Sequence, residues 1–333
     1  MRAAVIVQYN QPWEVKQIAD PRPSAGQVLI RIRASGMCGT DLHVHHGLFP
    51  LPTPVVAGHE PVGEIVELGA GVTDLRVGDR VGVHWNQKGD GRCPACQSGD
   101  SGHCPNAQTW MQLGGGNSEL MLAWASGCTL LPDGLDWAAA APIFCAGYTV
   151  MSGLRNADPK PGERVAVLGL GGLGHLALQF AHALGLETFA LTAQENKRAE
   201  LKSMGADEVL ISGDDPGAAL TRAGGADVIL STTNSARQIA SAFGALRLNG
   251  RLINMGLSDG AIAIDPMVLT LGQRQLRGSS QDERRDLYEA LQLTASGKVK
   301  PVIESYPLEQ ANAVRDRLAA GKVRYRAVLL HAR

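Results

Sequence analysis

Residues 165–174 have the sequence Val165-Ala166-Val167-Leu168-Gly169-Leu170-Gly171-Gly172-Leu173-Gly174. Four apolar residues suited to a buried strand precede a glycine-rich turn, and an apolar, helix-length segment follows it. Glycines allow a tight turn and a close approach of the backbone to a ligand, while the first N–H groups of a helix can bind a pyrophosphate. The pattern predicts a strand–turn–helix unit that binds a dinucleotide through Gly169, Gly171, Gly172, Leu173 and Gly174. The alternative is a plain corner between a strand and a helix.

Strand-sized apolar runs alternate with helix-length segments around and beyond this turn. The runs are Val165–Leu168, Thr188–Leu191, Glu208–Ile211, Val228–Ser231 and Arg251–Met255. Alternation of this kind is typical of a doubly wound parallel sheet with helices on both faces. We therefore expect an α/β dinucleotide-binding domain over residues 148–284.

The first part of the chain has a different pattern. Residues 1–130 contain short strand-like runs separated by Gly, Pro and Asp, among them Val28–Ala34, Gly63–Gly69 and Arg76–Val83. This pattern indicates a β-rich, barrel-like domain. The tail returns to strands at Lys300–Glu304 and Tyr325–Leu330, so residues 1–147 and 285–333 are expected to form one domain.

Bulk properties exclude several classes of protein. A chain of 333 residues exceeds the usual size of one core, and its net charge of −1 without clustered Lys or Arg indicates no nucleic-acid partner. Residues 165–186 carry no charge over 22 positions, but the glycine turn divides them, so we expect no membrane span. The N-terminus lacks a signal-peptide core, which favours the cytoplasm. In that reducing compartment six cysteines indicate metal binding or catalysis.

Three side chains able to bind a metal lie far apart in the sequence. They are Cys38 before Gly39-Thr40-Asp41, His59 between Gly58 and Glu60, and Cys145 between Phe144 and Ala146-Gly147. Two thiolates and one imidazole leave the fourth position of a tetrahedral zinc open, as in a catalytic site. Such a zinc can bind an alcohol oxygen and lower its pKa, and a nucleotide loop nearby in the sequence implies hydride transfer to nicotinamide. Either cysteine alone would more often be a small buried residue.

The choice between NAD and NADP depends on the strand after the glycine turn. An acidic residue at its end would hold the adenosine ribose hydroxyls, but Thr192 stands there. Lys197 and Arg198 are close enough in sequence to contact a 2′-phosphate, which slightly favours NADP. The alternative is that both are solvated residues at a helix start and that NAD is bound without the acid.

With these residues in view, the chain resembles a zinc-dependent alcohol dehydrogenase of the medium-chain dehydrogenase/reductase superfamily over nearly its whole length. The motifs that carry the resemblance are Gly58-His59-Glu60, Gly78-Asp79-Arg80-Val81, the cysteine lobe at 90–104, Leu131-Pro132-Asp133-Gly134, the loop at 169–174 and Gly250-Arg251-Leu252. The resemblance implies a GroES-like catalytic domain joined to a Rossmann domain. It also implies reversible hydride transfer between an alcohol or aldehyde and NAD(P).

The resemblance assigns roles around the metal. Cys38, His59 and Cys145 match the ligands of the catalytic zinc, and Glu60 matches a carboxylate that can approach the metal as an alternative ligand. Asp41 falls where the family has an acceptor for the ligating imidazole.

Further positions match the proton path, the cofactor site and the substrate site. Thr40 matches a hydroxyl that contacts the alcohol, and His43 matches the outer member of a proton relay. Thr149 corresponds to a residue near the nicotinamide, and Arg326 to a cation near the pyrophosphate. Substrate-lining positions are occupied by Phe49 and Trp85, whose aromatic walls favour primary aliphatic or aromatic alcohols. The alternative for these two rings is ordinary packing.

The cysteine lobe departs from the family pattern. Members often bind a structural zinc with four cysteines, whereas this chain has Asp90, Cys93, Cys96 and Cys104. Three thiolates and one carboxylate remain a feasible zinc site, so we expect zinc with Asp90 as a ligand. His103 is another conceivable ligand, and the alternative is a lobe with free thiols and no metal.

Two rival functions remain. One is a zinc-free quinone or enoyl reductase of the same superfamily, which would not need all three metal-binding side chains. The other is a non-catalytic scaffold that binds a nucleotide. By analogy with relatives of this length, which are commonly tetramers, we expect a homo-oligomer and specifically a tetramer.

Overall fold

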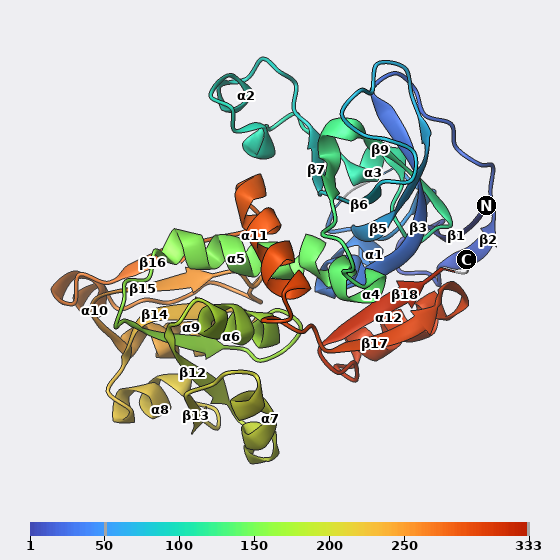
Figure 1. Cartoon of the computed structure of the whole chain (residues 1–333). Helices are drawn as coiled ribbons and strands as arrows, with labels where there is room; N and C mark the ends of the chain where they lie inside the picture. The colour runs from blue at the N-terminus through green and yellow to red at the C-terminus, as the bar shows by residue number, and fades with distance from the viewer. Residues whose placement is uncertain (50–51, 332–333) are drawn as a thin grey trace. The chain divides into compact units, whose positions relative to one another are not determined.

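A computed structural model describes residues 1–49 and 52–331, and the chain divides into two compact units (Figure 1). The first unit comprises Met1–Cys145 and Pro301–Arg333, and the second comprises Ala146–Lys300. The sequence placed residues 285–300 with the first domain. In the structure these residues belong to the second unit, because helix α11 (Arg284–Ala295) packs there against α5 (Ala146–Ala157).

The first unit is built mainly of antiparallel strands. Its elements are β1 (Arg2–Ile6), β2 (Glu14–Gln17), β3 (Gln27–Met37), α1 (Gly39–His45), β4 (Val55–Val56), β5 (Glu60–Leu68), β6 (Arg80–Val83), β7 (Asn86–Lys88), α2 (Pro94–Gln97), η1 (Ser101–His103), β8 (Gln108–Thr109), α3 (Trp110–Leu113), β9 (Leu120–Trp124), η2 (Ala125–Gly127), β10 (Cys128–Leu130), α4 (Trp137–Ala140), η3 (Ala141–Phe144), β17 (Ile303–Pro307), η5 (Leu308–Gln310), α12 (Ala311–Ala319) and β18 (Arg326–Leu330). The main sheet has the order β10-β6-β5-β3-β18-β17, and β9 also pairs with β3. Smaller sheets have the orders β2-β1-β4 and β7-β8.

Strand β3 organises the first unit because it pairs with β5, β9 and β18. Ile30 and Ile32 are fully buried in the core of this unit, as the alternation of a half-buried strand requires. The tail strand β18 runs antiparallel to β3, so the predicted return of the C-terminal strands to the first domain is observed. In this pairing Ala327 lies opposite Met37, so Arg326 comes close to the end of β3.

The second unit contains the predicted parallel sheet. Its elements are α5 (Ala146–Ala157), β11 (Arg164–Leu168), α6 (Gly174–Ala183), β12 (Glu187–Thr192), η4 (Glu195–Lys197), α7 (Arg198–Ser203), β13 (Glu208–Ile211), α8 (Pro216–Arg222), β14 (Ala226–Ser231), α9 (Ala236–Gly244), β15 (Leu246–Asn254), α10 (Pro266–Leu271), β16 (Gln275–Gly278) and α11 (Arg284–Ala295). The strand order is β13-β12-β11-β14-β15-β16, and every neighbouring pair is parallel. The chain reverses its direction across the sheet between β11 and β14. Ligands of doubly wound sheets bind at such a switch point, beyond the carboxyl ends of the strands.

Helix α11 is held in the second unit by polar contacts as well as by packing. The guanidinium of Arg155 in α5 forms ion pairs with Asp286 and Glu289 of α11, and the Arg155–Glu289 distance is 2.6 Å. The hydroxyl of Tyr148 donates to the backbone oxygen of Asp282 at 2.7 Å. These contacts link α5 to α11 over more than a hundred residues of chain.

No single helix in the described part of the chain is long and apolar enough to cross a membrane. One bent pair, Trp137–Phe144 followed by Ala146–Ala157, meets the requirements of length and composition only. The segment at 165–186 is not one helix: it contains strand β11, the glycine turn and helix α6.

Candidate active site and metal centres

Cys38 stands at the junction of β3 and α1, where local hydrogen bonds fix its side chain. It is the N-cap of α1, and its Sγ accepts from the backbone N–H of Thr40 at 3.3 Å. In return, Asp41 Oδ2 accepts from the backbone N–H of Cys38 at 2.9 Å. This reciprocal capping arrangement holds the thiol at the start of the helix, where partial positive charge favours a thiolate.

His59 and Glu60 enter the site at the start of β5, and two glycines make room for them. Gly58 has φ +101, and a Cβ there would lie 2.5 Å from the side-chain oxygen of Asn117. A Cβ on Gly36 of β3 would lie 1.8 Å from Glu60 Oε2, so the Glu60 carboxylate occupies the space that a side chain would need. Both glycines are therefore required by close packing at the site.

Cys145 is placed by the short helix η3 that precedes it. Phe144 is fully buried, and a Cβ on Gly82 of β6 would lie 2.1 Å from its ring. The ring of Phe144 thus packs directly on the backbone of β6, and the next residue in the chain is Cys145.

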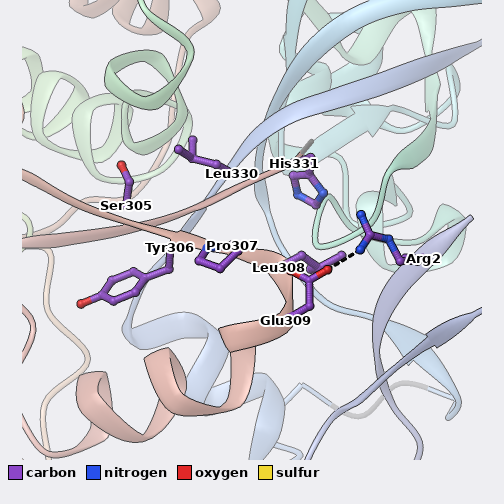
Figure 2. Close-up of a pocket in the computed structure, with 8 residues that line it drawn as sticks. All are labelled: Arg2, Ser305, Tyr306, Pro307, Leu308, Glu309, Leu330 and His331. Atoms are coloured by element: carbon purple, nitrogen blue, oxygen red, sulfur yellow. Dashed lines mark hydrogen bonds and ion pairs between the residues drawn. The ribbon is translucent and has the colours of Figure 1, made fainter. Parts of the chain in front are cut away.

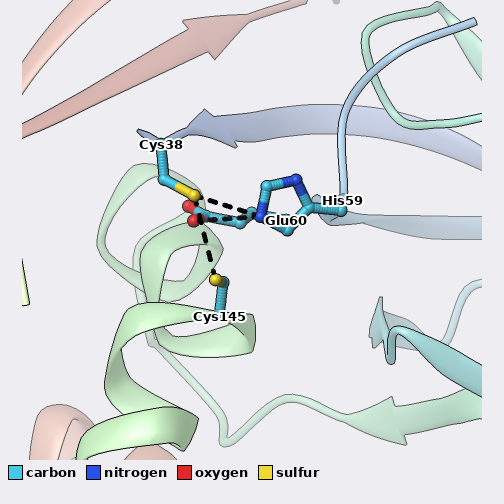
Figure 3. A group of neighbouring side chains, drawn as sticks. All are labelled: Cys38, His59, Glu60 and Cys145. Carbon is cyan, nitrogen blue, oxygen red and sulfur yellow. Dashed lines mark hydrogen bonds and ion pairs between the residues drawn. The ribbon is translucent and has the colours of Figure 1, made fainter. Parts of the chain in front are cut away.

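Three distant segments converge in Figure 3, which shows Cys38, His59, Glu60 and Cys145 with their polar ends together. Cys38 Sγ lies 3.2 Å from His59 Nε2 and 3.9 Å from Cys145 Sγ. One ligand atom from each of the four residues lies within 4.8 Å of the others. Two thiolates bound at about 2.3 Å to a tetrahedral zinc would be about 3.8 Å apart, so the donor set and its spacing fit this ion.

Buried partners surround these four residues. His59 Nδ1 faces Asp41 Oδ1 at 3.4 Å, on the side of the ring opposite Cys38. Glu60 forms an ion pair through Oε1 with the guanidinium of Arg326, and both side chains are almost completely buried. The resemblance implies a position for Arg326 near a pyrophosphate, and in the structure its guanidinium lies against Glu60.

Protons and charges in this cluster are strongly coupled. The hydrogen bond with Cys145 holds the pKa of the Cys38 thiol well below its usual range, and the pKa of Cys145 is raised correspondingly. Burial alone would lower the pKa of His59, but the charges of Cys38 and Asp41 raise it well above its usual value. Burial raises the pKa of Glu60 to about 7 although Arg326 opposes the shift. A bound divalent cation would replace these shared protons, because thiolate and neutral imidazole are the ligand forms.

The remaining predicted residues of the first unit lie around this cluster. Thr40 and His43 are partly exposed and three residues apart in α1, so they share one side of the helix. The rings of Phe49 and Trp85 are 5.7 Å apart, and Trp85 lies 5.4 Å from the imidazole of His59. Trp110, which the sequence did not single out, packs on both His59 and Trp85.

A second group of potential ligands is formed by Asp90, Cys93, Cys96 and Cys104, again within 4.8 Å of one another. Cys93 caps α2, and a Cβ on Gly89 would lie 2.5 Å from Cys96 Sγ. The structure brings together the four residues that the sequence predicted. His103 does not join this group, because its ring is half-exposed and pairs with Asp100 at 2.9 Å.

The Asp90 carboxylate is oriented by its neighbours. Oδ1 accepts from the backbone N–H groups of Arg92 and Cys93 at 2.8 and 2.9 Å, and Oδ2 accepts from the Asn106 amide at 2.7 Å. The hydrogen bonds from Asn106 and the backbone lower the pKa of Asp90 well below its usual range. A carboxylate has about four lone-pair positions, so these bonds leave capacity for a metal.

The glycine turn of the second unit has the geometry that the sequence predicted. Gly169 has φ +89, and a Cβ on Gly174 would lie 1.9 Å from the backbone oxygen of Gly169. In contrast, a Cβ on Gly171 would meet no described atom within 4 Å. Packing inside the protein therefore requires Gly169 and Gly174, whereas Gly171 borders open space that a ligand could approach. The turn follows β11 directly, at the switch point of the sheet.

The residues predicted for the adenosine and nicotinamide ends also lie in the second unit. Thr192 ends β12 and is buried, and its hydroxyl accepts from the backbone N–H of Gln194 at 3.1 Å. Arg198 begins α7 beside Lys197, and its guanidinium binds both oxygens of Glu195 at 2.6 and 2.9 Å. Thr149 is buried in α5.

Two cavities of about 460 Å³ lie elsewhere and contain none of the predicted site residues. One is lined by Arg2, the segment 305–309, Leu330 and His331 (Figure 2). The Arg2 guanidinium is already paired with Glu119 and Glu309. The metal-competent groups are therefore separate from both of these cavities.

Comparison with known proteins agrees with this arrangement. Residues 24–133 match the family described as alcohol dehydrogenase GroES-like domain, and residues 172–296 match zinc-binding dehydrogenase. An alcohol dehydrogenase of Geobacillus stearothermophilus is 41% identical over 99% of this chain and 99% of its own. The structure of the Aeropyrum pernix alcohol dehydrogenase superposes with a TM-score of 0.90 at 31% identity, covering 99% of this chain and 100% of that one. A Geotrichum candidum acetophenone reductase in complex with NAD has a TM-score of 0.87 at 28% identity, with 99% and 96% covered.

The chain therefore belongs to the zinc-dependent alcohol dehydrogenases of the medium-chain dehydrogenase/reductase superfamily. The predicted family is confirmed, and so is the combination of a GroES-like domain with a parallel-sheet dinucleotide-binding domain. Zinc and a nicotinamide cofactor are the cofactors that this family and its structural neighbours support.

Proposed function

We propose that this enzyme oxidises primary aliphatic or aromatic alcohols, and reduces the corresponding aldehydes, by exchange of a hydride with NAD(P). The observation that carries the proposal is the convergence of Cys38, His59 and Cys145 beside Glu60. Zinc held by the two thiolates and the imidazole would act as a Lewis acid, and a nicotinamide would exchange the hydride.

The side chains around the metal would move the proton. Thr40 lies two residues after Cys38, and its hydroxyl would accept the proton of the substrate alcohol at Oγ1 while it releases its own proton towards His43. His43 lies about one helical turn further along α1 and is partly exposed, so its ring would pass the proton to solvent. Asp41 would hold the His59 ring through Nδ1.

Glu60 has a second role in this proposal. Its carboxylate belongs to the group of potential ligands, and Arg326 holds one of its oxygens. We infer that Glu60 serves as an alternative metal ligand when substrate and water exchange at the open position.

For the cofactor, we infer that NADP is accepted as well as NAD. Strand β12 ends at Thr192, whose neutral side chain would not repel a 2′-phosphate as a carboxylate would. Lys197 and Arg198, where η4 ends and α7 begins, are the cations proposed to contact that phosphate. The glycine turn at 169–174 would bind the pyrophosphate through backbone N–H groups.

The direct test follows reduced nicotinamide by its absorbance near 340 nm with 1-butanol, benzyl alcohol or 2-butanol, each with NAD and with NADP. We expect turnover with both cofactors and a higher kcat/KM for the two primary alcohols. High turnover of 2-butanol alone would contradict the proposed substrate class. Activity on a quinone or enone that survives chelation of zinc would favour the zinc-free reductase, and cofactor binding without any turnover would favour the scaffold.

An apolar surface on the second unit supports self-association. Edge strand β16 pairs only with β15 among the described strands. The exposed large apolar side chains of β15, α10 and β16 are Leu248, Met267, Leu269, Leu271 and Leu276. An open strand edge with exposed apolar residues can pair with an identical copy across a twofold axis. We therefore propose a homo-oligomer: this contact alone would join two copies, and the tetramer is proposed by analogy with relatives of this length. Light scattering should give a molar mass of at least twice the 35.1 kDa of one chain. A molar mass of one chain at micromolar concentration would contradict this proposal.

A further inference from the structure

Trp110 lies against both the metal-competent histidine and the predicted substrate wall. Its ring centroid is 6.3 Å from that of His59, with an angle of 31° between the planes, and 5.6 Å from that of Trp85, with an angle of 84°. The Trp85 ring in turn meets His59 at 5.4 Å and 68°, and Phe49 at 5.7 Å and 60°. The Trp110 ring is thus tilted relative to the plane of the imidazole, and it is nearly perpendicular to the ring of Trp85.

The edge of the His59 imidazole faces polar groups, among them Glu60 Oε1 at 3.8 Å from Nε2. Cys38 Sγ approaches Nε2 at 3.2 Å, and Asp41 Oδ1 approaches Nδ1 at 3.4 Å. The His59 ring turns about its Cβ–Cγ bond, and packing on the ring adds a restraint to the hold of these polar contacts. Aromatic packing by Trp110 and Trp85 supplies that restraint.

The backbone around Trp110 is bonded to both segments that carry these rings. The backbone N–H of Trp110 donates to the oxygen of Trp85 at 3.2 Å, beside the β7–β8 pair. A few residues later, three backbone N–H groups donate to the segment that precedes His59. These bonds are Gly115 to Val56 at 3.0 Å, Gly116 to Gly58 at 2.8 Å and Asn117 to Ala57 at 2.9 Å. Residues 110–117 therefore form a brace between the His59 segment and the Trp85 segment.

The environment of the Trp110 side chain indicates that Trp110 acts through packing and not through a hydrogen bond. It is 1% exposed, and its indole N–H makes no hydrogen bond within the described residues. A phenyl ring would fill much of this space without burying a donor. The indole N–H has no partner among the described residues, so Trp110 acts on its two neighbours through the aromatic surface of its ring.

We propose that Trp110 is a positioning residue that fixes the ring plane of His59 and the tilt of Trp85, and that it thereby limits the size of alcohol the site admits. The proposal rests on the function proposed above for Cys38, His59 and Cys145. With a smaller residue at this position, Trp85 can tilt into the vacated space, and the wall that it forms moves away from the metal-binding group.

The test compares Trp110→Leu, Trp110→Met and Trp110→Phe with the wild-type enzyme. Trp137→Leu is the matched control, because that tryptophan packs on Arg80 outside this cluster. Two quantities are measured: the ratio of kcat/KM for benzyl alcohol to that for 1-butanol, and the visible absorption spectrum of the cobalt-substituted enzyme. The spectrum responds to ligand geometry and does not require turnover.

For Trp110→Leu and Trp110→Met we expect the ratio to rise about tenfold and the cobalt bands to shift. Trp110→Phe should restore both quantities to near wild type, and Trp137→Leu should leave them unchanged. A merely structural role would lower both kcat/KM values together, so an unchanged ratio and spectrum in a folded Leu or Met variant would overturn the proposal. If Trp110→Leu does not fold, Trp110→Met decides, since the unbranched, flexible methionine side chain adapts to an irregular space. If the wild type oxidises neither alcohol, the proposed function fails, and the cobalt spectra alone still decide whether Trp110 positions His59.

Discussion

Replacing Cys38 with serine should lower kcat/KM for alcohol oxidation by about 10³-fold or more while leaving nicotinamide cofactor binding nearly unchanged. A serine hydroxyl stays protonated near neutral pH, so the site would lose one of two anionic sulfur ligands and with it most of its affinity for zinc. The nucleotide loop at 169–174 belongs to the other unit, and its glycines do not depend on Cys38. Zinc content by mass spectrometry, cofactor binding by fluorescence and turnover should be measured on one preparation.

Cys128→Ser is the matched control for this substitution. Cys128 is also buried, but it belongs to neither group of potential ligands, and its thiol donates to the backbone oxygen of Trp124 at 3.5 Å. This variant should keep its zinc and most of its activity. His59→Ala should behave like Cys38→Ser. Retained turnover in a folded, zinc-free Cys38→Ser enzyme would refute a metal-dependent mechanism.

Local sequence was sufficient for features that depend on local chemistry. The glycine turn could be predicted because Gly169 and Gly174 meet requirements set within a few residues, namely a positive φ and a close approach of two backbone segments. The parallel sheet followed from the alternation of strand and helix periods. The candidate metal ligands could be predicted from short motifs in the sequence, and the structure brings the members of each group together.

Contacts that depend on strand pairing could not be read from the sequence. Glu60 and Arg326 are 266 residues apart and meet because β5 and β18 both pair with β3. Gly36 of β3 pairs with Glu60 on one side and Val328 on the other. Without a side chain at Gly36, the carboxylate of Glu60 extends over the backbone of β3 to reach Arg326. This arrangement requires the register of three strands, which no local pattern contains.

Two other features differ from the sequence prediction. Glu195 and Arg198 are three residues apart, a spacing at which helical side chains pair, and their ion pair reduces the charge that Arg198 could offer a phosphate. Residues 285–300 carry an ordinary helical pattern that does not show which unit they join. In the second unit, buried Leu287 and Leu291 pack the helix, and Asp286 and Glu289 form ion pairs with Arg155.

Replacing Asp90 with alanine should remove one of two zinc ions per chain and destabilise the first unit, while leaving the catalytic ion in place. Asp90 supplies the only oxygen ligand in a group whose other members are Cys93, Cys96 and Cys104. Three thiolates alone leave a structural zinc site incomplete, and such sites contribute directly to the free energy of folding. The metal ratio should therefore fall from about two to about one, with a lower Tm.

Asp90 also organises its own turn, because it accepts hydrogen bonds from the backbone of Arg92 and Cys93, so alanine alone does not separate the two roles. Asp90→Asn keeps an acceptor for these bonds but is a poor zinc ligand, whereas Asp90→Cys loses the carboxylate bonds and restores a thiolate ligand. If Asp90 binds zinc, the cysteine variant should keep about two ions per chain and the asparagine variant about one. Asp100→Ala, in the same lobe but paired with His103 and outside the group, should change neither metal content nor Tm appreciably. Two ions in the asparagine variant would make Asp90 a turn residue only, and one ion in the wild type would show that this lobe holds no metal.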